Sequence, residues 1–262
     1  PDGWAFKGVV YNEMKGAMGN ADAQLYRHAG QVLVPSTPYR FNSGGEPSDI
    51  PSLDYDDLVR FHRAHYNAAN ACFATYGDLD VAELHAKFAP YLAARPGTPI
   101  PLPAPEGPHA APATAAFPVP IQAGQDARDV TIATVTWVTG DMRDLADSLE
   151  LELIDQLLLG HAGAPLRLAV ESSGIGRAMA SSGASTFGAN GTFGVGIKGL
   201  DPADGPRFER LVLDTLDRLV AEGLPAADIE AALHQLELER RLISGDRFPF
   251  GLELALAATD AW

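Results

Sequence analysis

Glu13 is the first residue that could do chemistry, because the residues around it predict a helix whose apolar side includes this carboxylate. At about 100° per residue, Glu13 lies about 20° from Phe6 and about 160° from Lys15. A carboxylate inside an apolar stripe is costly unless a metal, a charge or several hydrogen bonds compensate it. Glu13 is therefore a candidate metal ligand or catalytic acid. A buried salt bridge or a bond to nearby backbone is the structural alternative, and the pattern alone favours it.

The histidines do not complete a catalytic motif on their own. His62 and His65 share one face of a predicted helix, but no His-Glu-x-x-His sequence occurs in the chain. Without a nearby acidic pattern we interpret both as surface or structurally satisfied histidines. His161 follows Gly160, which is predicted to end a helix, and a loop role is the better interpretation for it.

Two further features have structural interpretations. Gly194–Gly199 (GVGIKG) matches a dinucleotide-binding motif in letters, but its glycines fall within a predicted strand, so close backbone packing is expected. The single cysteine, Cys72, excludes an intrachain disulfide and a cysteine-rich zinc site. Its neighbours are apolar, and we expect a buried, inert thiol.

The charge balance argues against nucleic acid as a partner. The chain has 34 acidic and 19 basic residues and a net charge of −15, whereas nucleic-acid binding requires a cationic surface. A negative surface instead attracts basic ligands or peptides. No apolar run reaches the length of about 18 residues needed to span a membrane. We therefore expect a soluble chain that does not bind a membrane, in the cytoplasm or an organelle lumen rather than secreted.

The elements that position these residues are mostly helices. Periodicity and capping residues predict helices over these ranges: 4–19, 21–34, 54–66, 81–94, 145–159, 165–172, 206–222 and 225–242. Strands are expected at 71–76, 130–138, 177–185 and 192–200. Since two of these strands are consecutive and separated by a short turn, they are expected to pair antiparallel. This order predicts the α+β class, with helices on one face of a sheet.

Prolines mark the clearest boundary. Nine of them lie between Arg95 and Pro120, where they exclude a helix interior or a central strand and favour an extended linker. We predict a first domain over residues 1–95, a Pro/Ala-rich linker over 96–120 and a second domain over 121–262.

Several motifs together resemble the presequence protease branch of the insulinase/pitrilysin-type zinc metallopeptidases. The first, Phe6–Gly16 (FKGVVYNEMKG), is similar to the helix that supplies the family's distal glutamate. The others follow in the family's order and are, with their sequences, Asn42–Pro47 (NSGGEP), Ile50–Leu53 (IPSL), Phe61–Ala71 (FHRAHYNAANA), Leu157–Gly160 (LLLG), Ala164–Arg167 (APLR), Gly196–Gly199 (GIKG) and Phe248–Leu252 (FPFGL).

The resemblance implies a fold, a cofactor and a reaction. It implies two metallopeptidase-like domains, each a sheet covered by a layer of helices, of which the first is incomplete here and the second is expected to continue beyond Trp262. Glu13 matches the third zinc ligand, which joins two histidines of a His-x-x-Glu-His helix whose glutamate is the general base. Zinc lowers the pKa of a bound water, so that a hydroxide can attack a peptide bond. The family hydrolyses short unstructured peptides in a chamber formed by two halves of the enzyme.

The chain lacks the His-x-x-Glu-His motif, so its own catalytic residues are expected to be none and the base is expected upstream. We expect an internal piece, inactive alone, whose partners are basic unfolded peptides and the missing N- and C-terminal parts of the protein. The alternative is a catalytically silent relative that acts as a scaffold; a plain peptide-binding module is a weaker third hypothesis. An upstream zinc motif in the parent would separate the first two.

Overall fold

The computed structural model describes residues 7–107, 109–243 and 248–261. The chain divides into two compact units, each made of two separate stretches. One unit comprises Pro1–Glu46 with Ala104–Glu237, and the other comprises Pro47–Pro103 with Leu238–Trp262. The domain boundaries expected at residues 95 and 120 stay predictions.

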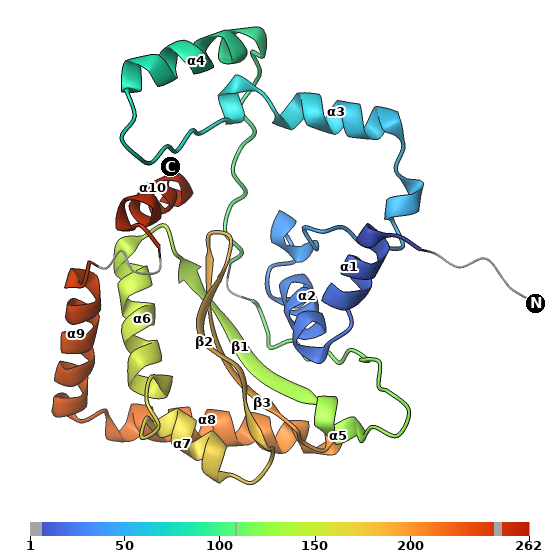
Figure 1. The fold of residues 1–262 in the computed structure, drawn as a ribbon. Helices are drawn as coiled ribbons and strands as arrows, with labels where there is room; N and C mark the ends of the chain where they lie inside the picture. Colours follow the sequence, from blue (N-terminus) through green and yellow to red (C-terminus); the bar gives the residue numbers. More distant parts are fainter. Residues whose placement is uncertain (1–6, 108, 244–247, 262) are drawn as a thin grey trace, which may run out of the picture. The chain divides into compact units, whose positions relative to one another are not determined.

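The first unit is built around a three-stranded antiparallel sheet in the order β1-β3-β2 (Figure 1). Trp137 of β1 lies opposite Phe193 of β3, and Val135 lies opposite Val195, which places these four side chains on one face. Helices and strands together give the α+β class expected from the sequence. The strands are β1 (Ile132–Asp141), β2 (Ala178–Phe187) and β3 (Asn190–Lys198).

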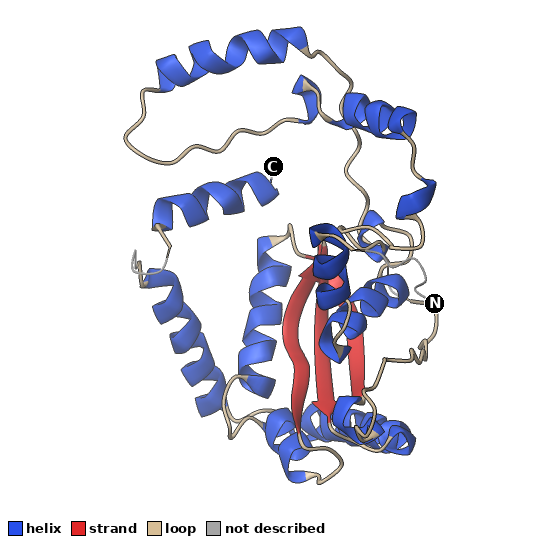
Figure 2. Cartoon of the chain, turned by 45° about the vertical axis from the view of Figure 1, so that its right-hand side comes forward, coloured by secondary structure: helices blue, strands red, loops and turns tan. Residues whose placement is uncertain are grey.

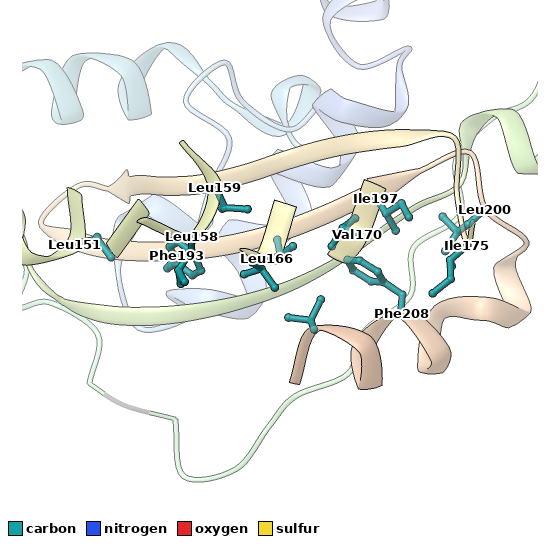
Figure 3. Close-up of a cluster of buried hydrophobic side chains, with 12 residues drawn as sticks. Leu151, Leu158, Leu159, Leu166, Val170, Ile175, Phe193, Ile197, Leu200 and Phe208 are labelled. Atoms are coloured by element: carbon teal, nitrogen blue, oxygen red, sulfur yellow. The ribbon is translucent and has the colours of Figure 1, made fainter. Parts of the chain in front are cut away.

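Three helices cover that face of the sheet. The core joins Leu166 of α7 and Phe208 of α8, 0% and 1% exposed, to the apolar side chains of β3 (Figure 3). Burying side chains of this size contributes about 1.5–3 kcal/mol each. The covering helices are α6 (Leu145–Leu159), α7 (Pro165–Ser172) and α8 (Gly205–Glu222).

Local sequence explains where these helices begin and end. The carboxylate of Asp144 accepts the backbone N–H groups of Ala146 and Asp147 at 2.8 and 3.3 Å, which caps α6. The proline at position 165 occupies the first turn of α7, where no donor is needed. The predicted bounds 145–159 and 165–172 are confirmed.

The remaining helices of this unit are α1 (Val9–Ala17), α2 (Ala21–Leu33), the single turn α5 (Ala127–Val130) and α9 (Ala226–Arg241). In Figures 1 and 2, α6 and α2 flank the strands from different sides. The predicted helix 4–19 is confirmed from Val9 to Ala17, and its residues 4–6 lie outside the described residues. α9 continues past Glu237, at which the first unit ends.

The second unit contains α3 (Tyr55–His65), α4 (Val81–Ala94) and α10 (Phe250–Ala261). A capping box closes the start of α3, where Asp54 accepts the N–H of Asp57 at 2.8 Å and Asp57 accepts the N–H of Asp54. α3 and α4 match the ranges expected from the sequence, whereas α10 had no predicted counterpart.

One predicted strand is wrong. Residues 71–76 form neither helix nor strand, and no described strand pairs with them. β-branched and aromatic residues favour a strand only where a neighbour satisfies its backbone groups. The same segment corrects a second expectation: Cys72 is exposed rather than buried. The stretch has no ladder, and although Phe73 stacks on Phe88 of α4 at 4.5 Å, this contact leaves Cys72 exposed.

The proline-rich segment is extended, as expected. Its described residues form neither helix nor strand. Part of it is anchored to the first unit: His109 Nε2 lies 2.8 Å from the carbonyl oxygen of Leu33, and the ring of Phe117 stacks on His28 at 3.9 Å.

Candidate functional site

Glu13 lies in the middle of α1, and its side chain is exposed. Its apolar neighbours Val9 and Val10 are 73% and 68% exposed. The expectation that Glu13 sits in a buried stripe is therefore wrong for this chain. The apolar arc exists in the helix, but no described element covers it, and an arc becomes a core only when another surface packs on it.

The metal site implied by Glu13 requires more ligands than the described residues bring together. A catalytic zinc ion takes three protein ligands and an open position. In the part of the chain that the structure describes, no group of three or more His, Cys, Asp or Glu residues could hold a metal ion. A single exposed carboxylate does not fit zinc by itself, and the role of Glu13 as a ligand stays a prediction.

The two histidines of α3 make local contacts. The ring of His65 stacks on Phe61 at 3.8 Å, and its Nδ1 lies 2.9 Å from the carbonyl oxygen of Phe61. The ring of His62 stacks on Tyr66 at 4.7 Å. These contacts are consistent with the structural interpretation of both residues. His161 lies in the turn after α6, where its Nδ1 accepts the N–H of Gly163 at 3.2 Å.

Gly194 and Gly196 of GVGIKG lie within β3, where both pack closely, and Gly199 follows the end of the strand. A Cβ at Gly196 would lie 3.0 Å from the carbonyl oxygens of Ala180 and Ser181. A Cβ at Gly194 would lie 3.2 Å from Thr136 Oγ1. The packing interpretation is confirmed.

Sequence reasoning missed a polar link between the proline-rich segment and the sheet. Asn190, at the start of β3, is 1% exposed, and its side-chain amide bonds the backbone of Glu106 in both directions at 3.2 Å. The carboxylate of Glu106 in turn accepts the backbone N–H and the hydroxyl of Ser36 at 2.8 and 2.7 Å. An asparagine directly after a Gly-Ala turn was the signal that could have indicated a buried amide.

These bonds change the electrostatics of Glu106. The backbone N–H and the hydroxyl of Ser36 favour its charged form and hold its pKa below the usual value of a glutamate, with a smaller contribution from His109. Elsewhere, the side chain of Arg143 lowers the pKa of Asp141, and the side chain of Arg128 lowers that of Asp126.

The first unit also has a surface pocket of about 360 Å³ between α6, α7 and β2. Asp155, Arg167 and Ser182 contribute its polar groups. Arg167 is held by Glu171, one helical turn later, with its Nε 3.0 Å from the carboxylate. Gly183, beside this pocket, has φ of 102°, and a Cβ there would lie 2.9 Å from Asp155 Oδ1.

The architecture and the sequence define the family. Residues 52–236 match the family model described as the Peptidase M16 inactive domain. That range covers most of the chain, and the chain belongs to this family. A crystal structure of the peptidase M16 inactive domain from Pseudomonas fluorescens has the same fold, with a TM-score of 0.64 and 20% identity over 96% of this chain and 58% of that one.

The curated relatives identify the branch. The chain is 33% identical to "Presequence protease 1, chloroplastic/mitochondrial" of Arabidopsis thaliana over 262 residues, which is 98% of this chain and 24% of the relative. It is 34% identical to "Presequence protease, mitochondrial" of Yarrowia lipolytica over 98% of this chain and 26% of the relative. The resemblance to presequence proteases is confirmed. The chain spans about a quarter of the length of these relatives.

Helices of the described residues are all too short or too polar to cross a membrane.

Proposed function

We propose that this chain is part of a zinc-dependent metalloendopeptidase that hydrolyses short, unstructured peptides, and that Glu13 supplies its third zinc ligand. The similarity to presequence proteases along 98% of the chain carries this proposal. The general base and the other two ligands come from other parts of the protein, so the chain alone contributes no catalytic residue.

The surroundings of Glu13 support its role. α1 presents a carboxylate between exposed apolar side chains, among them Val9 and Val10. When such a face is covered, the carboxylate loses its water and needs a cation or several donors to replace it. A metal ion held jointly with histidines from a second element meets that need. In the intact protein, the exposed face is then the place where the site is completed.

The charge of the chain supports basic peptides as substrates. With a net charge of −15, the chain produces a negative field that concentrates cationic ligands near its surface. Unstructured peptides pay no unfolding cost before they enter an enclosed site. Organelle-targeting peptides, which are rich in arginine and poor in acidic residues, have this chemistry.

Replacement of Glu13 in the intact parent protein tests the proposal. Glu13→Gln removes the charged ligand and keeps the size of the side chain, so zinc content and peptide cleavage should both fall by about 100-fold or more. Metal analysis and cleavage of a fluorogenic basic peptide measure the two losses. Glu209→Gln, at an exposed glutamate of α8, is the matched control and should leave both unchanged. Full activity and full zinc content in Glu13→Gln would remove Glu13 from the site.

The second candidate function is a catalytically silent scaffold. It is favoured by one observation: the matching family model describes an inactive domain, and its residues 52–236 leave out Glu13. The sequence of the parent protein upstream of Pro1 separates the two candidates. A His-x-x-Glu-His motif there supports the peptidase, and its absence together with no measurable cleavage supports the scaffold. Binding of basic peptides by a zinc-free parent that cleaves nothing would support a plain binding module instead.

A further inference from the structure

The second unit has a pocket of about 370 Å³ at the ends of α3 and α4. Its wall includes His62, Arg63 and Tyr66 from α3 and the turn after it, and Arg95 and Pro96 after α4. This volume lies at the small end of the range for ligand pockets, which is about 300–1,000 Å³. No carboxylate lines the pocket. A cationic and aromatic lining without acids is unusual for this acidic chain.

Hydrogen bonds between the two segments build the pocket. The backbone N–H of Ala68 donates to the carbonyl oxygen of Arg95 at 2.8 Å, and the N–H of Ile100 donates to Asn70 Oδ1 at 2.7 Å. Asn67 also lines the pocket and is only 8% exposed, and its side-chain amide donates to the carbonyl oxygen of Ala64 at 2.7 Å. These bonds place Arg63 and Arg95 on one pocket wall.

Arg63 and Arg95 also differ from the other lysine and arginine residues of this segment, because neither forms an ion pair with an acid of the described residues. Residues 47–103, all of them described, contain four lysines and arginines. Arg60 pairs with Asp57, and Lys87 pairs with Glu83 at 2.7 Å. No carboxylate of the described residues forms an ion pair with Arg63 or Arg95. The guanidinium groups of Arg63 and Arg95, two residues that line the pocket, therefore keep their donors for a ligand.

We propose that this pocket binds the C-terminal carboxylate of a short peptide. Planar guanidinium groups match a carboxylate with paired hydrogen bonds, and the stacked rings of His62 and Tyr66 provide an apolar surface for the last side chain of the peptide. Both helices end at the pocket, and the negative end of a helix dipole opposes an anion in proportion to its charge, so it weakens binding of a carboxylate less than binding of a doubly charged phosphate. A singly charged carboxylate is thus favoured over a phosphate. The proposal does not rest on the peptidase activity proposed above.

Titration of the chain of residues 1–262 with two matched peptides tests this site. The probes are N-acetylated Ala-Ala-Phe with a free C-terminus and the same peptide with a C-terminal amide, followed by calorimetry or NMR at low salt. The free acid should bind, and the amide should bind about 10-fold more weakly or not at all, because it lacks the charge. Equal binding of the two peptides would overturn the proposal.

Substitutions locate the binding. Arg63→Gln and Arg95→Gln should each weaken binding of the free acid by about 3- to 10-fold, since both groups are exposed and screened by water. Arg60→Gln, on the same helix but paired with Asp57 and outside the pocket, is the matched control and should bind as the wild type does. Wild-type affinity in the Arg63→Gln, Arg95→Gln double variant would refute the site. Circular dichroism verifies that each variant is folded. The Lys variants at both positions keep the charge but lose the paired hydrogen bonds, so they should bind the free acid more weakly than the wild type and more tightly than the Gln variants.

Two further probes test whether the pocket recognises a peptide C-terminus or any small anion. Benzoate presents a carboxylate and an aromatic ring without a peptide, and inorganic phosphate presents only an anion. Weaker binding of both than of the peptide acid supports a peptide C-terminus. Tighter binding of either one would overturn that assignment.

Discussion

Glu106 links the proline-rich segment to the first unit through bonds at both its backbone and its side chain. Its carboxylate is bound by Ser36, and its backbone is bound by the buried amide of Asn190. Because Ser36 donors favour the ionised carboxylate, the pKa of Glu106 is lower in the folded chain than in the unfolded one. A depressed pKa of an acid adds stability above its unfolded pKa and loses it as the pH falls through the folded pKa.

Glu106→Gln should therefore destabilise the chain near pH 7 and have no effect in acid. We expect a loss of about 0.5 kcal/mol in the free energy of unfolding at pH 7, a small value because water screens the site. The difference should shrink as the pH falls below the usual glutamate pKa of 4.5. Urea unfolding of both proteins between pH 3.5 and 7 measures it, and a difference that persists or grows in acid would contradict the assignment.

Glu13 and Cys72 show how residue-level inference depends on context. The apolar arc around Glu13 follows from helical geometry and could be derived from the sequence, yet the arc is exposed here. Cys72 was expected to be buried because its neighbours are apolar, and it is exposed. The local sequence indicates which side chains favour burial, but a side chain is buried only when another helix, strand or loop packs over it.

At the scale of elements, helix ends follow local chemistry. The predicted ranges 81–94, 145–159 and 165–172 are those that the structure has. Each begins at a capping carboxylate or at a proline in the first turn, signals that act within three or four residues. Helix boundaries were therefore accessible from the sequence.

The cap of α6 provides a direct test at this scale. Asp144→Ala leaves the N–H groups of Ala146 and Asp147 without their acceptor and should cost about 1 kcal/mol in the free energy of unfolding. Urea unfolding followed by circular dichroism at pH 7 measures the change. Asp217→Ala, at an exposed position inside α8, is the control and should be neutral or slightly stabilising. Equal effects of the two substitutions would mean that the cap contributes nothing.

Strands were predicted less completely from the sequence than helices were. The strands β1, β2 and β3 were expected, with ends that differ by one to three residues, but the strand at 71–76 does not form. A strand is stabilised by bonds to a neighbour that is distant in sequence, and no local pattern reports whether that neighbour is present.

At the scale of the whole molecule, the two units differ in their cores. In the first, twelve buried apolar residues form one cluster. In the second, Asn67 is the only buried residue among those described, and large apolar side chains such as Tyr55 and Tyr91 are exposed. Stability is therefore concentrated in the first unit.

Hydrogen exchange should reveal this asymmetry. We expect backbone amides of β3 and α8 to exchange about 100-fold more slowly than those of α3 and α4, because opening the latter breaks few apolar contacts. Mass spectrometry of peptic fragments after exchange at pH 7 measures both sets in one experiment. Equal protection in the two units would contradict the assignment of the core.

The metal content of the chain is also a property of the whole molecule. The purified chain of residues 1–262 should bind about 0.1 zinc ions or fewer per molecule and cleave no peptide, because three ligands are needed and Glu13 is one. Metal analysis after dialysis against zinc, with the intact parent protein as the control, checks this. Stoichiometric zinc with cleavage by the chain alone would show that it holds a complete site.

The sequence alone determined the family, the α+β class, most helix ends and the acidic charge, because each depends on residue types or on spacing within a few turns. Only the tertiary structure decided which apolar surfaces are covered, which strand has a partner and that Arg63 and Arg95 line one pocket. The physical reason is the range of the interactions. A cap or a periodicity is local, whereas burial, strand pairing and a pocket are formed by residues that folding brings together from distant parts of the chain.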